Sequence, residues 1–502
     1  MNIKRAKEEI RNTIEAYLLK DEYGAYEIPV IRQRPVLLIG PPGVGKTQIM
    51  EQISQECRIG LVAYTITHHT RQSAIGLPYI QEKIFNGIRR SVTEYTMSEI
   101  VASIYEKIEF TGLKEGILFI DEINCVSETL APAMLQFLQC KTFGNHRIPE
   151  GWIIVAAGNP PEYNKSVREF DVVTLDRLKM IYVEPDLKVW REYASQVQIH
   201  PAILAYLDVK QQNFCRIETT VDGKRFSTPR GWEDLSRLIE VYEKLGKTVD
   251  KDVVQQYIQH EKIAGDFANY LELYYKYQQD YQIEEILDGT IRETLCDRLA
   301  RAPFDERLSV MSLLLEKLDA HFRLLFRKEE RLERLLQLFK EMKPGSFEEG
   351  EYGSALEHLE GIAAGAQAER KYKREAGLLG RQEDRLYQDI GKILEDTIQE
   401  IKAESLYLAE QVWEKIEEIF DGKNREYEEL FENCGLWLEH GFDFMEAAFG
   451  DSQEMVVFVT GLNTGYYSVK FLQEYPCERY YQYNKRLLFD SQEKEILSRH
   501  LL

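Results

Sequence analysis

Cysteine is scarce in this chain of 502 residues, and none of the seven cysteines forms a Cys-x-x-Cys pair. An odd number of unpaired cysteines is typical of a protein from a reducing compartment. We therefore expect free thiols and a cytoplasmic location. The nine histidines do not combine with the cysteines at zinc-ligand spacing, so the sequence predicts no structural zinc site.

Positive charge is also in short supply, because 63 Lys and Arg face 84 Asp and Glu, for a net charge of −21. This balance argues against broad electrostatic capture of nucleic acid or of an anionic membrane, although a local basic groove is compatible with it. No stretch approaches the roughly 20 apolar residues of a membrane span. The first residues, "MNIKRAKEEIRNTIEAYLL", alternate charged and apolar residues at helical spacing, unlike a signal peptide.

The first part of the chain carries five short runs rich in Val, Ile and Leu. These are Val36–Gly40, Leu61–Thr67, Ile117–Asp121, Ile153–Gly158 and Met180–Glu184. Amphipathic helical stretches such as Thr47–Cys57 and Ser98–Glu109 separate most of them. Strands that are apolar on both faces and alternate with helices are typical of a doubly covered parallel sheet.

After about Leu187 the strand pattern fades, and helical patterns follow to the end of the chain. We divide the sequence into a sheet domain (1–187), a helical domain (188–304), a region of long, coiled-coil-like helices (305–455) and a small helical unit (456–502). The stripes of the long helices are Leu325, Leu332, Leu335 and Phe339; Leu386, Ile390, Ile393 and Leu394; and Leu408, Val412, Ile416 and Ile419. Breaks are expected at 342–354 and 361–370. The aromatic-rich last segment is interpreted as packed helices, with a nucleic-acid stacking surface as the alternative.

The stretch "LLIGPPGVGKTQIM" follows the first strand and opens a helix, which is the context that a phosphate-binding loop needs. Its glycines let backbone N–H groups turn toward phosphate oxygens, and the helix N-terminus adds partial positive charge. Lys46 would reach the β- and γ-phosphates, and the Thr47 hydroxyl would bind Mg²⁺. The candidate nucleotide contacts are Gly40, Pro41, Pro42, Gly43, Val44, Gly45, Lys46, Thr47 and Gln48.

Two adjacent carboxylates, Asp121 and Glu122, end the buried run "GILFIDEIN". In a P-loop fold Asp121 would hold the Mg²⁺ hydration shell, and Glu122 would polarise the attacking water. The simpler interpretation is a helix N-cap acid. In "GWIIVAAGNPPEYN", Asn159 ends another run, where its amide could bond the γ-phosphate or the water, or simply form a turn.

Two arginines complete the candidate site. Arg177 precedes the last strand and could finish a neighbouring subunit's site, or pair with Asp176 or Asp171. Arg230, in "STPRGWEDLS", could reach back to the nucleotide from the start of a helix, or pair with Glu233 or Asp234.

These motifs, in this order, resemble an AAA+ ATPase over about residues 30–245. "DEIN", "AAGNP", "LDRL" and "TPRGW" are similar to the MoxR branch of that superfamily. The resemblance implies that Gly40–Thr47 form Walker A, Asp121 with Glu122 Walker B, Asn159 sensor 1, Arg177 the arginine finger and Arg230 sensor 2. It also implies a five-stranded parallel sheet of order 5-1-4-3-2, a helical lid over 188–304, ATP with Mg²⁺, and a homo-oligomeric ring, usually a hexamer. The implied role is chaperone-like remodelling of a protein partner, often one with a von Willebrand factor A domain.

The chain departs from the branch in details. It has "DRL" where members commonly read "DRF" and "AAGNP" where they read "ATxNP", and Arg168 is a rival finger. Residues after the lid match no motif of the family. His68 and His69 lack metal-ligand spacing on a helix, and Gly76, Pro78 and Tyr79 predict a loop into an insertion, where related ATPases place central-channel elements.

Three alternatives stay open. A nucleic-acid motor or loader is disfavoured by the acidic balance. A GTPase is disfavoured because "NKSV" (164–167) lacks the acid of the guanine-reading NKxD pattern. A nucleotide-gated scaffold with negligible turnover is opposed only by the presence of Glu122.

Overall fold

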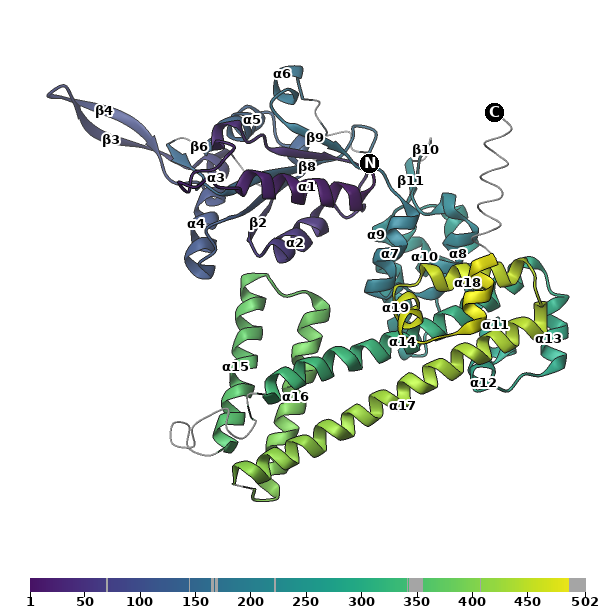
Figure 1. The fold of residues 1–502 in the computed structure, drawn as a ribbon. Coiled ribbons are helices and arrows are strands. Elements are labelled where there is room, and N and C mark those ends of the chain that lie inside the picture. The colour runs from purple at the N-terminus through teal and green to yellow at the C-terminus, as the bar shows by residue number, and fades with distance from the viewer. Residues whose placement is uncertain are drawn as a thin grey trace. The chain divides into compact units, whose positions relative to one another are not determined.

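The computed structural model describes residues 1–68, 71–143, 145–163, 167, 170–220, 223–340, 342, 355–406 and 408–486. The chain divides into two compact units (Figure 1). The first comprises Met1–Val189 and the segment Ala368–Asp384. The second runs from Trp190 to Gln367 and continues from Arg385.

A five-stranded sheet forms the centre of the first unit. Its strands are β1 (Val36–Ile39), β2 (Gly60–Thr65), β5 (Gly116–Asp121), β8 (Trp152–Gly158) and β9 (Lys179–Tyr182). All neighbouring strands are parallel, in the order β2-β5-β8-β1-β9. Each of the five apolar runs is therefore a strand of one parallel sheet. Numbered among themselves from the β9 edge, the strands follow the order 5-1-4-3-2.

Side chains that alternate along each strand enter two separate cores. On β8, Ile153 and Val155 pack with α1 (Ile3–Leu18) and α2 (Lys46–Cys57). Ile154 and Ala156 pack with α4 (Glu99–Thr111) and α5 (Ala131–Cys140) on the opposite face. Because both faces are covered, the strands are continuously apolar and not alternating in polarity. The parallel arrangement brings the carboxyl ends of the strands to one edge, where the candidate residues follow them.

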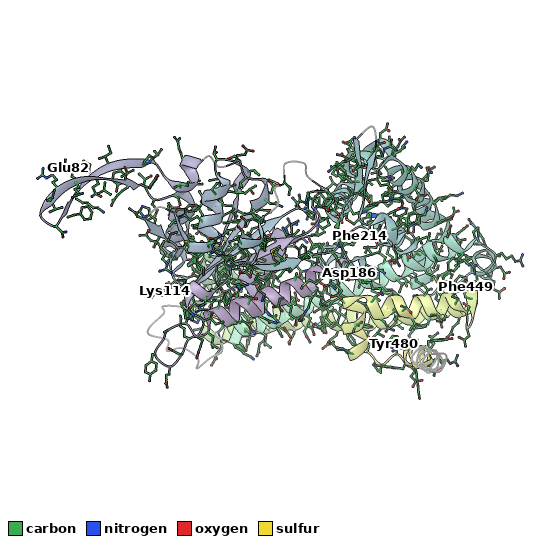
Figure 2. All side chains as sticks on the ribbon, turned by 90° about the horizontal axis from the view of Figure 1, so that it is seen from above. Glu82, Lys114, Asp186, Phe214, Phe449 and Tyr480 are labelled. Atoms are coloured by element: carbon green, nitrogen blue, oxygen red, sulfur yellow. The ribbon has the colours of Figure 1, made fainter. Side chains whose placement is uncertain are left out.

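Three hairpins were not predicted. They are β3 (Pro78–Phe85) with β4 (Ile88–Tyr95), β6 (Thr142–Phe143) with β7 (His146–Arg147), and β10 (Arg216–Thr220) with β11 (Gly223–Ser227). The insertion expected after Gly76 is thus the β3–β4 hairpin, which turns at Asn86 and Gly87, both with positive φ. Figure 2 labels Glu82 on this ribbon, where every residue of β3 is exposed. The β10–β11 pair also shows that the expectation of no strands after Leu187 is wrong. Two short helices, α3 (Arg71–Ile75) and α6 (Val172–Leu175), also belong to the first unit.

The second unit is otherwise helical. Its first helices are α7 (Leu187–Val197), α8 (Pro201–Val209), α9 (Pro229–Lys244), α10 (Lys251–Tyr257), α11 (Glu261–Tyr281), α12 (Ile283–Leu287) and α13 (Glu293–Ala300). Thr228 caps α9 by accepting a hydrogen bond from the Gly231 N–H, and Trp232 is fully buried. The helical pattern that runs through 251–277 in the sequence is divided between α10 and α11.

Long helices follow, namely α14 (Phe304–Lys340), α15 (Ala355–Ala376), α16 (Arg381–Ala403) and α17 (Ala409–Phe449). Figure 1 shows α14 and α17 side by side, and the two helices are in contact. The predicted stripes are largely buried, but Leu408 is 65% exposed. The break expected at 361–370 is wrong, because that segment lies inside α15. Alanines there favour a helix, and Gly361 and Gly365 face open space, so neither is needed for a turn. The other expected break, 342–354, lies outside the described residues apart from Met342.

Toward the end of the described chain lie α18 (Gln453–Thr464) and α19 (Tyr466–Glu474), and residues 478–486 are also helical. Most of their aromatic residues are buried: Phe471 stacks on Phe322 of α14 with ring centroids 4.4 Å apart, whereas Tyr466 is 56% exposed. The buried rings of Phe458 and Phe471 are therefore not available as a stacking surface. Within the described part of the chain, no helix is both long enough and apolar enough to span a membrane.

Candidate functional site

The loop between β1 and α2 has the backbone conformation that its glycines allow. Gly43 and Gly45 have φ of 77° and 90°, which side chains rarely adopt. At Gly40 a Cβ atom would lie 2.6 Å from the carbonyl oxygen of Val183. The loop therefore needs glycine at these three positions to reach the first turn of α2.

Lys46 begins α2 and is 8% exposed. Its Nζ donates hydrogen bonds to the carbonyl oxygens of Gly40 and Pro41, each at 2.8 Å, and to Asn159 Oδ1 at 3.0 Å. The buried charge is thus held by its own loop and by a residue that lies 113 positions later. The structure brings the phosphate-loop motif and the "AAGNP" motif together.

Thr47, in the first turn of α2, contacts Asp121 at the end of β5. The Thr47 hydroxyl donates to Asp121 Oδ2 at 3.0 Å, and the backbone N–H of Glu122 donates to Asp121 Oδ1 at 2.9 Å. Both carboxylate oxygens are therefore fixed in direction. A hydroxyl and a carboxylate are the hard oxygen ligands that Mg²⁺ prefers. These two side chains fit the metal-binding role that the sequence predicts for them.

Glu122 sits directly beyond the strand in the left-handed region, with φ 56° and ψ 34°. For a residue with a Cβ this conformation costs about 1–2 kcal/mol, so the surrounding contacts must hold it. One of them is Thr67, whose hydroxyl donates to Glu122 Oε2 at 3.1 Å. Burial, together with the charges of Glu122 and Asp121, raises the pKa of the neighbouring Cys125 thiol. Thr67 was not among the predicted site residues, although it ends the second apolar run.

Asn159 is hydrogen-bonded to Asn124, which lies just beyond the end of β5. Asn124 was not among the predicted site residues. The Asn124 side-chain amide donates to the Asn159 carbonyl oxygen at 2.7 Å and accepts from the Asn159 N–H at 3.3 Å. A Cβ atom on Gly158 would lie 2.6 Å from Asn124 Oδ1, so glycine makes room for this amide. In the sequence, the feature that could have identified Asn124 is its place as the asparagine of "DEIN", two residues after the acidic pair.

The two arginines belong to different units, Arg177 to the first and Arg230 to the second. Arg177 is exposed and donates to Gln139 on α5, and it forms no ion pair with Asp171 or Asp176. Arg230 is exposed at the start of α9 and belongs to the second unit. Its suggested partner Glu233 instead bonds Arg237 and Tyr193. Arg168 and His69 lie outside the described residues.

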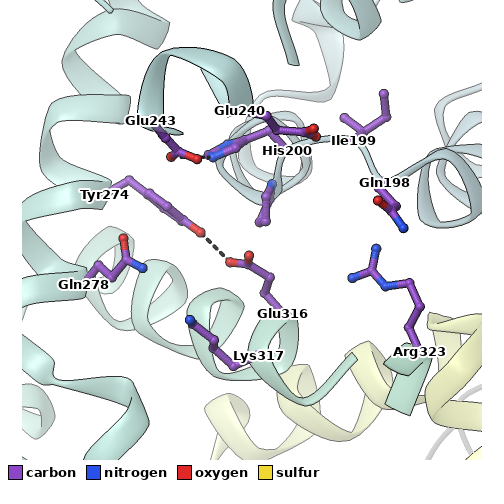
Figure 3. Close-up of a pocket in the computed structure, with 11 residues that line it drawn as sticks. Gln198, Ile199, His200, Glu240, Glu243, Tyr274, Gln278, Glu316, Lys317 and Arg323 are labelled. Carbon is purple, nitrogen blue, oxygen red and sulfur yellow. Dashed lines mark hydrogen bonds and ion pairs between the residues drawn. The ribbon is translucent and has the colours of Figure 1, made fainter. Parts of the chain in front are cut away.

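A separate cavity of about 340 Å³ lies in the helical unit (Figure 3). In it the Tyr274 hydroxyl donates to Glu316 Oε2 at 2.5 Å, and His200 Nε2 lies 3.0 Å from Glu243 Oε1. Burial raises the pKa of Glu316, outweighing the hydrogen bond from Tyr274 and the charge of Lys317, both of which lower it. This carboxyl is thus held against ionisation.

The raised pKa of Glu316 predicts a pH-dependent gain in stability for Glu316→Gln. Below the ordinary pKa of about 4.5 the carboxyl is neutral in both folded and unfolded chains and costs nothing. As the pH rises, the unfolded chain releases the proton first, so the folded parent loses stability. The neutral amide avoids this loss and can still accept from Tyr274. We expect thermal melts at pH 8 to give a Tm about 2 °C or more above that of the parent.

Near pH 4 the two melting temperatures should coincide. Glu272→Gln, which changes an exposed glutamate of α11, is the matched control and should have no effect at either pH. An advantage of Glu316→Gln that did not shrink toward low pH would contradict the assignment of the raised pKa.

Comparison with known proteins identifies the class of the first unit. Residues 35–178 match the family model of the AAA domain, dynein-related subfamily, which is less than half of the chain. Together with the parallel sheet and its phosphate loop, the match supports an AAA+ ATPase domain in this part of the chain. ATP binding and ATPase activity are inferred from that family.

Two solved structures show weak overall likeness. A protein from Cytophaga hutchinsonii described as a putative ATPase is 17% identical, with a TM-score of 0.22, over 38% of this chain and 56% of its own. A RuvB variant from Thermotoga maritima is 16% identical, with a TM-score of 0.27, over 52% of this chain and 69% of its own. These scores are too low to bear on activity or assembly. No curated protein matches the chain.

Proposed function

We propose that this protein is an AAA+ ATPase of the MoxR branch that binds ATP with Mg²⁺ and uses its hydrolysis to remodel or assemble a protein partner. The observation that supports this most is the convergence of Lys46, Thr47, Asp121 and Asn159 from three neighbouring strand ends. Ligands of open α/β sheets bind at the carboxyl edge of the strands.

Nucleotide binding is assigned to the loop from Gly40 to Gln48. Lys46 already points at carbonyl oxygens of this loop, and phosphate oxygens would replace them as acceptors. The N-terminus of α2 and the loop N–H groups add positive potential for the same anion. The Mg²⁺ that Thr47 and Asp121 would hold neutralises charge on the phosphates.

Hydrolysis is assigned to Glu122, with Asn159 beside it. The Glu122 carboxylate would take a proton from the attacking water, while the neutral Asn159 amide orients the water or the γ-phosphate without adding charge. The hydrogen bond from Thr67 occupies one Glu122 oxygen, so an active arrangement requires this bond to break or the other oxygen to act. Purified full-length chain should release inorganic phosphate from MgATP, and no phosphate release above a blank would refute the proposal.

We further propose a cytoplasmic homo-oligomeric ring, usually a hexamer in this branch, in which Arg177 enters the neighbouring subunit's site. Its exposure supports this role, as does the absence of an ion pair to it within the described part of the chain. Arg230 would contact the γ-phosphate, so that the position of the lid would depend on whether this phosphate is present.

The partner, as the branch suggests, would carry a von Willebrand factor A domain. We assign its contact to the β3–β4 hairpin, where Ile80 and Ile84 are 76% and 71% exposed.

Mixing of two inactive variants tests the ring. Arg177→Ala should lower phosphate release about 10³-fold, in line with other finger residues, because its own site is intact but receives no finger. Lys46→Ala supplies Arg177 but has no working site. Mixed in equal amounts, the two should recover activity above either alone. No recovery would contradict a finger acting between subunits, and recovery with Arg168→Ala in place of Arg177→Ala would assign the role to Arg168.

A further inference from the structure

Asn124 joins the two strand ends that carry the proposed catalytic groups. The backbone ladder between β5 and β8 ends at the pair Ile120 and Ala156. Beyond it the strands lose direct pairing, and the Asn124 side chain takes over. Its amide makes two hydrogen bonds with the main chain of Asn159, at 2.7 and 3.3 Å. One side chain thus continues the pairing of the two strands where the chemistry is proposed to occur.

This amide is well placed to fix the direction of Asn159. Asn124 is 4% exposed, and Gly158 leaves the space that it fills. Because both the N–H and the carbonyl of Asn159 are held, neither of the two peptide groups that flank its Cα can rotate without breaking a hydrogen bond to the buried Asn124. The Asn159 side chain continues from this fixed peptide to Lys46 Nζ at 3.0 Å.

The other end of Asn124 is attached to the acidic pair. Asn124 lies in the 3-10 turn Ile123–Cys125, which starts immediately after Glu122 in its left-handed conformation. A change in the Glu122 backbone would therefore displace the Asn124 amide and, through it, the Asn159 peptide. The contacts form a continuous path from Walker B through Asn124 and Asn159 to Lys46.

We propose that Asn124 is a positioning residue that couples Walker B to sensor 1. It acts by holding the Asn159 amide at the angle that hydrolysis requires. This inference rests on the proposed function, because it assigns a residue to the same reaction. Nothing in the sequence beyond "DEIN" marked this residue, since its two partners lie 35 positions away.

The test is a double-mutant cycle on the full chain. Asn124→Leu keeps the branched shape without the hydrogen bonds and without adding charge, and Asn159→Ala removes the side chain that Asn124 is proposed to aim. In the parent background Asn124→Leu should lower kcat about tenfold or more, as expected for a misplaced catalytic group. In the Asn159→Ala background it should lower kcat less than about twofold, because no amide remains to be positioned.

Binding and folding measurements separate positioning from a general structural effect. MgATP affinity, measured by calorimetry, should change less than about threefold in Asn124→Leu, so the loss appears in kcat alone. Asn213→Leu, which removes another buried asparagine in the helical unit, is the control; it should lower Tm and leave kcat within about twofold. If Asn124→Leu fails to fold, Asn124→Asp, which keeps one acceptor oxygen, takes its place in the cycle.

Each outcome decides the proposal. The same fold-loss of kcat in both backgrounds, or no loss in the parent background, would overturn it. A parent chain that released no phosphate would overturn the proposed function and this inference together. A parent that hydrolyses ATP but gives an additive cycle would overturn this inference alone.

Discussion

Glu122→Gln is expected to lower phosphate release by about 10²–10⁴-fold, the range for removal of a general base, while MgATP affinity stays within about threefold of the parent. The amide keeps an oxygen that can accept from Thr67 and the same branching for the left-handed turn. The substitution therefore removes the charge and the basicity but not the local structure. Steady-state phosphate release and calorimetry with MgATP measure the two quantities.

The matched control is Glu150→Gln. Glu150 is an exposed glutamate just before β8, at the amino edge of the sheet, opposite the candidate site. It should leave both hydrolysis and affinity unchanged. If Glu122→Gln turned over ATP as fast as the parent, the assignment of Glu122 as the base would be wrong, whatever the role of Asp121.

Lys46→Ala should weaken MgATP binding by more than about 100-fold, because charge-assisted hydrogen bonds contribute about 1.5–3 kcal/mol each and the ammonium would make at least two. Removing Lys46 also leaves the Gly40 and Pro41 carbonyls without the donor that they have now. Lys46→Met is the companion variant. It removes the ammonium group but retains most of the side-chain volume, so a loss of binding cannot be ascribed to collapse of the loop.

Lys114→Ala is the control for this loss. Lys114 is exposed just before β5, at the amino edge of the sheet, and its removal deletes the same charge without touching the loop. Affinity equal to that of the parent is expected. Tight MgATP binding by Lys46→Ala and by Lys46→Met would contradict the proposed role of the loop.

The parallel sheet was predictable because burial of both its faces makes each strand apolar along its own sequence. Both faces are buried, so strands such as β5 and β8 are continuous apolar runs, and each ends in the polar residues that the edge exposes. The phosphate loop was predictable for a similar reason, because the glycines at 43 and 45 are required by the backbone itself.

The hairpins and the uninterrupted course of α15 were harder to predict. Every residue of β3 is exposed, so no core imposes a pattern on its sequence. Gly361 and Gly365 suggested a break, but a helix tolerates glycines at a moderate cost when the rest of the segment favours it.

Contacts between distant residues account for the rest of the site. Thr67 and Asn124 reach Glu122 and Asn159 only because β2, β5 and β8 are neighbours in the sheet. Their partners lie 55 and 35 residues away, and no spacing rule in one sequence predicts such pairs. Arg177 and Arg230 stay predictions, because their proposed targets are a neighbouring subunit and a bound nucleotide.

The central claim is that a nucleoside triphosphate and Mg²⁺ bind at the carboxyl edge of this sheet. Titration of MgATP into the purified full-length chain in a calorimeter tests it most directly. We expect saturable binding at one site per chain that is lost in Lys46→Ala and retained in Lys114→Ala. A parent chain that gives no heat of binding with MgATP, or one that binds equally well after Lys46→Ala and Lys46→Met, would contradict the account.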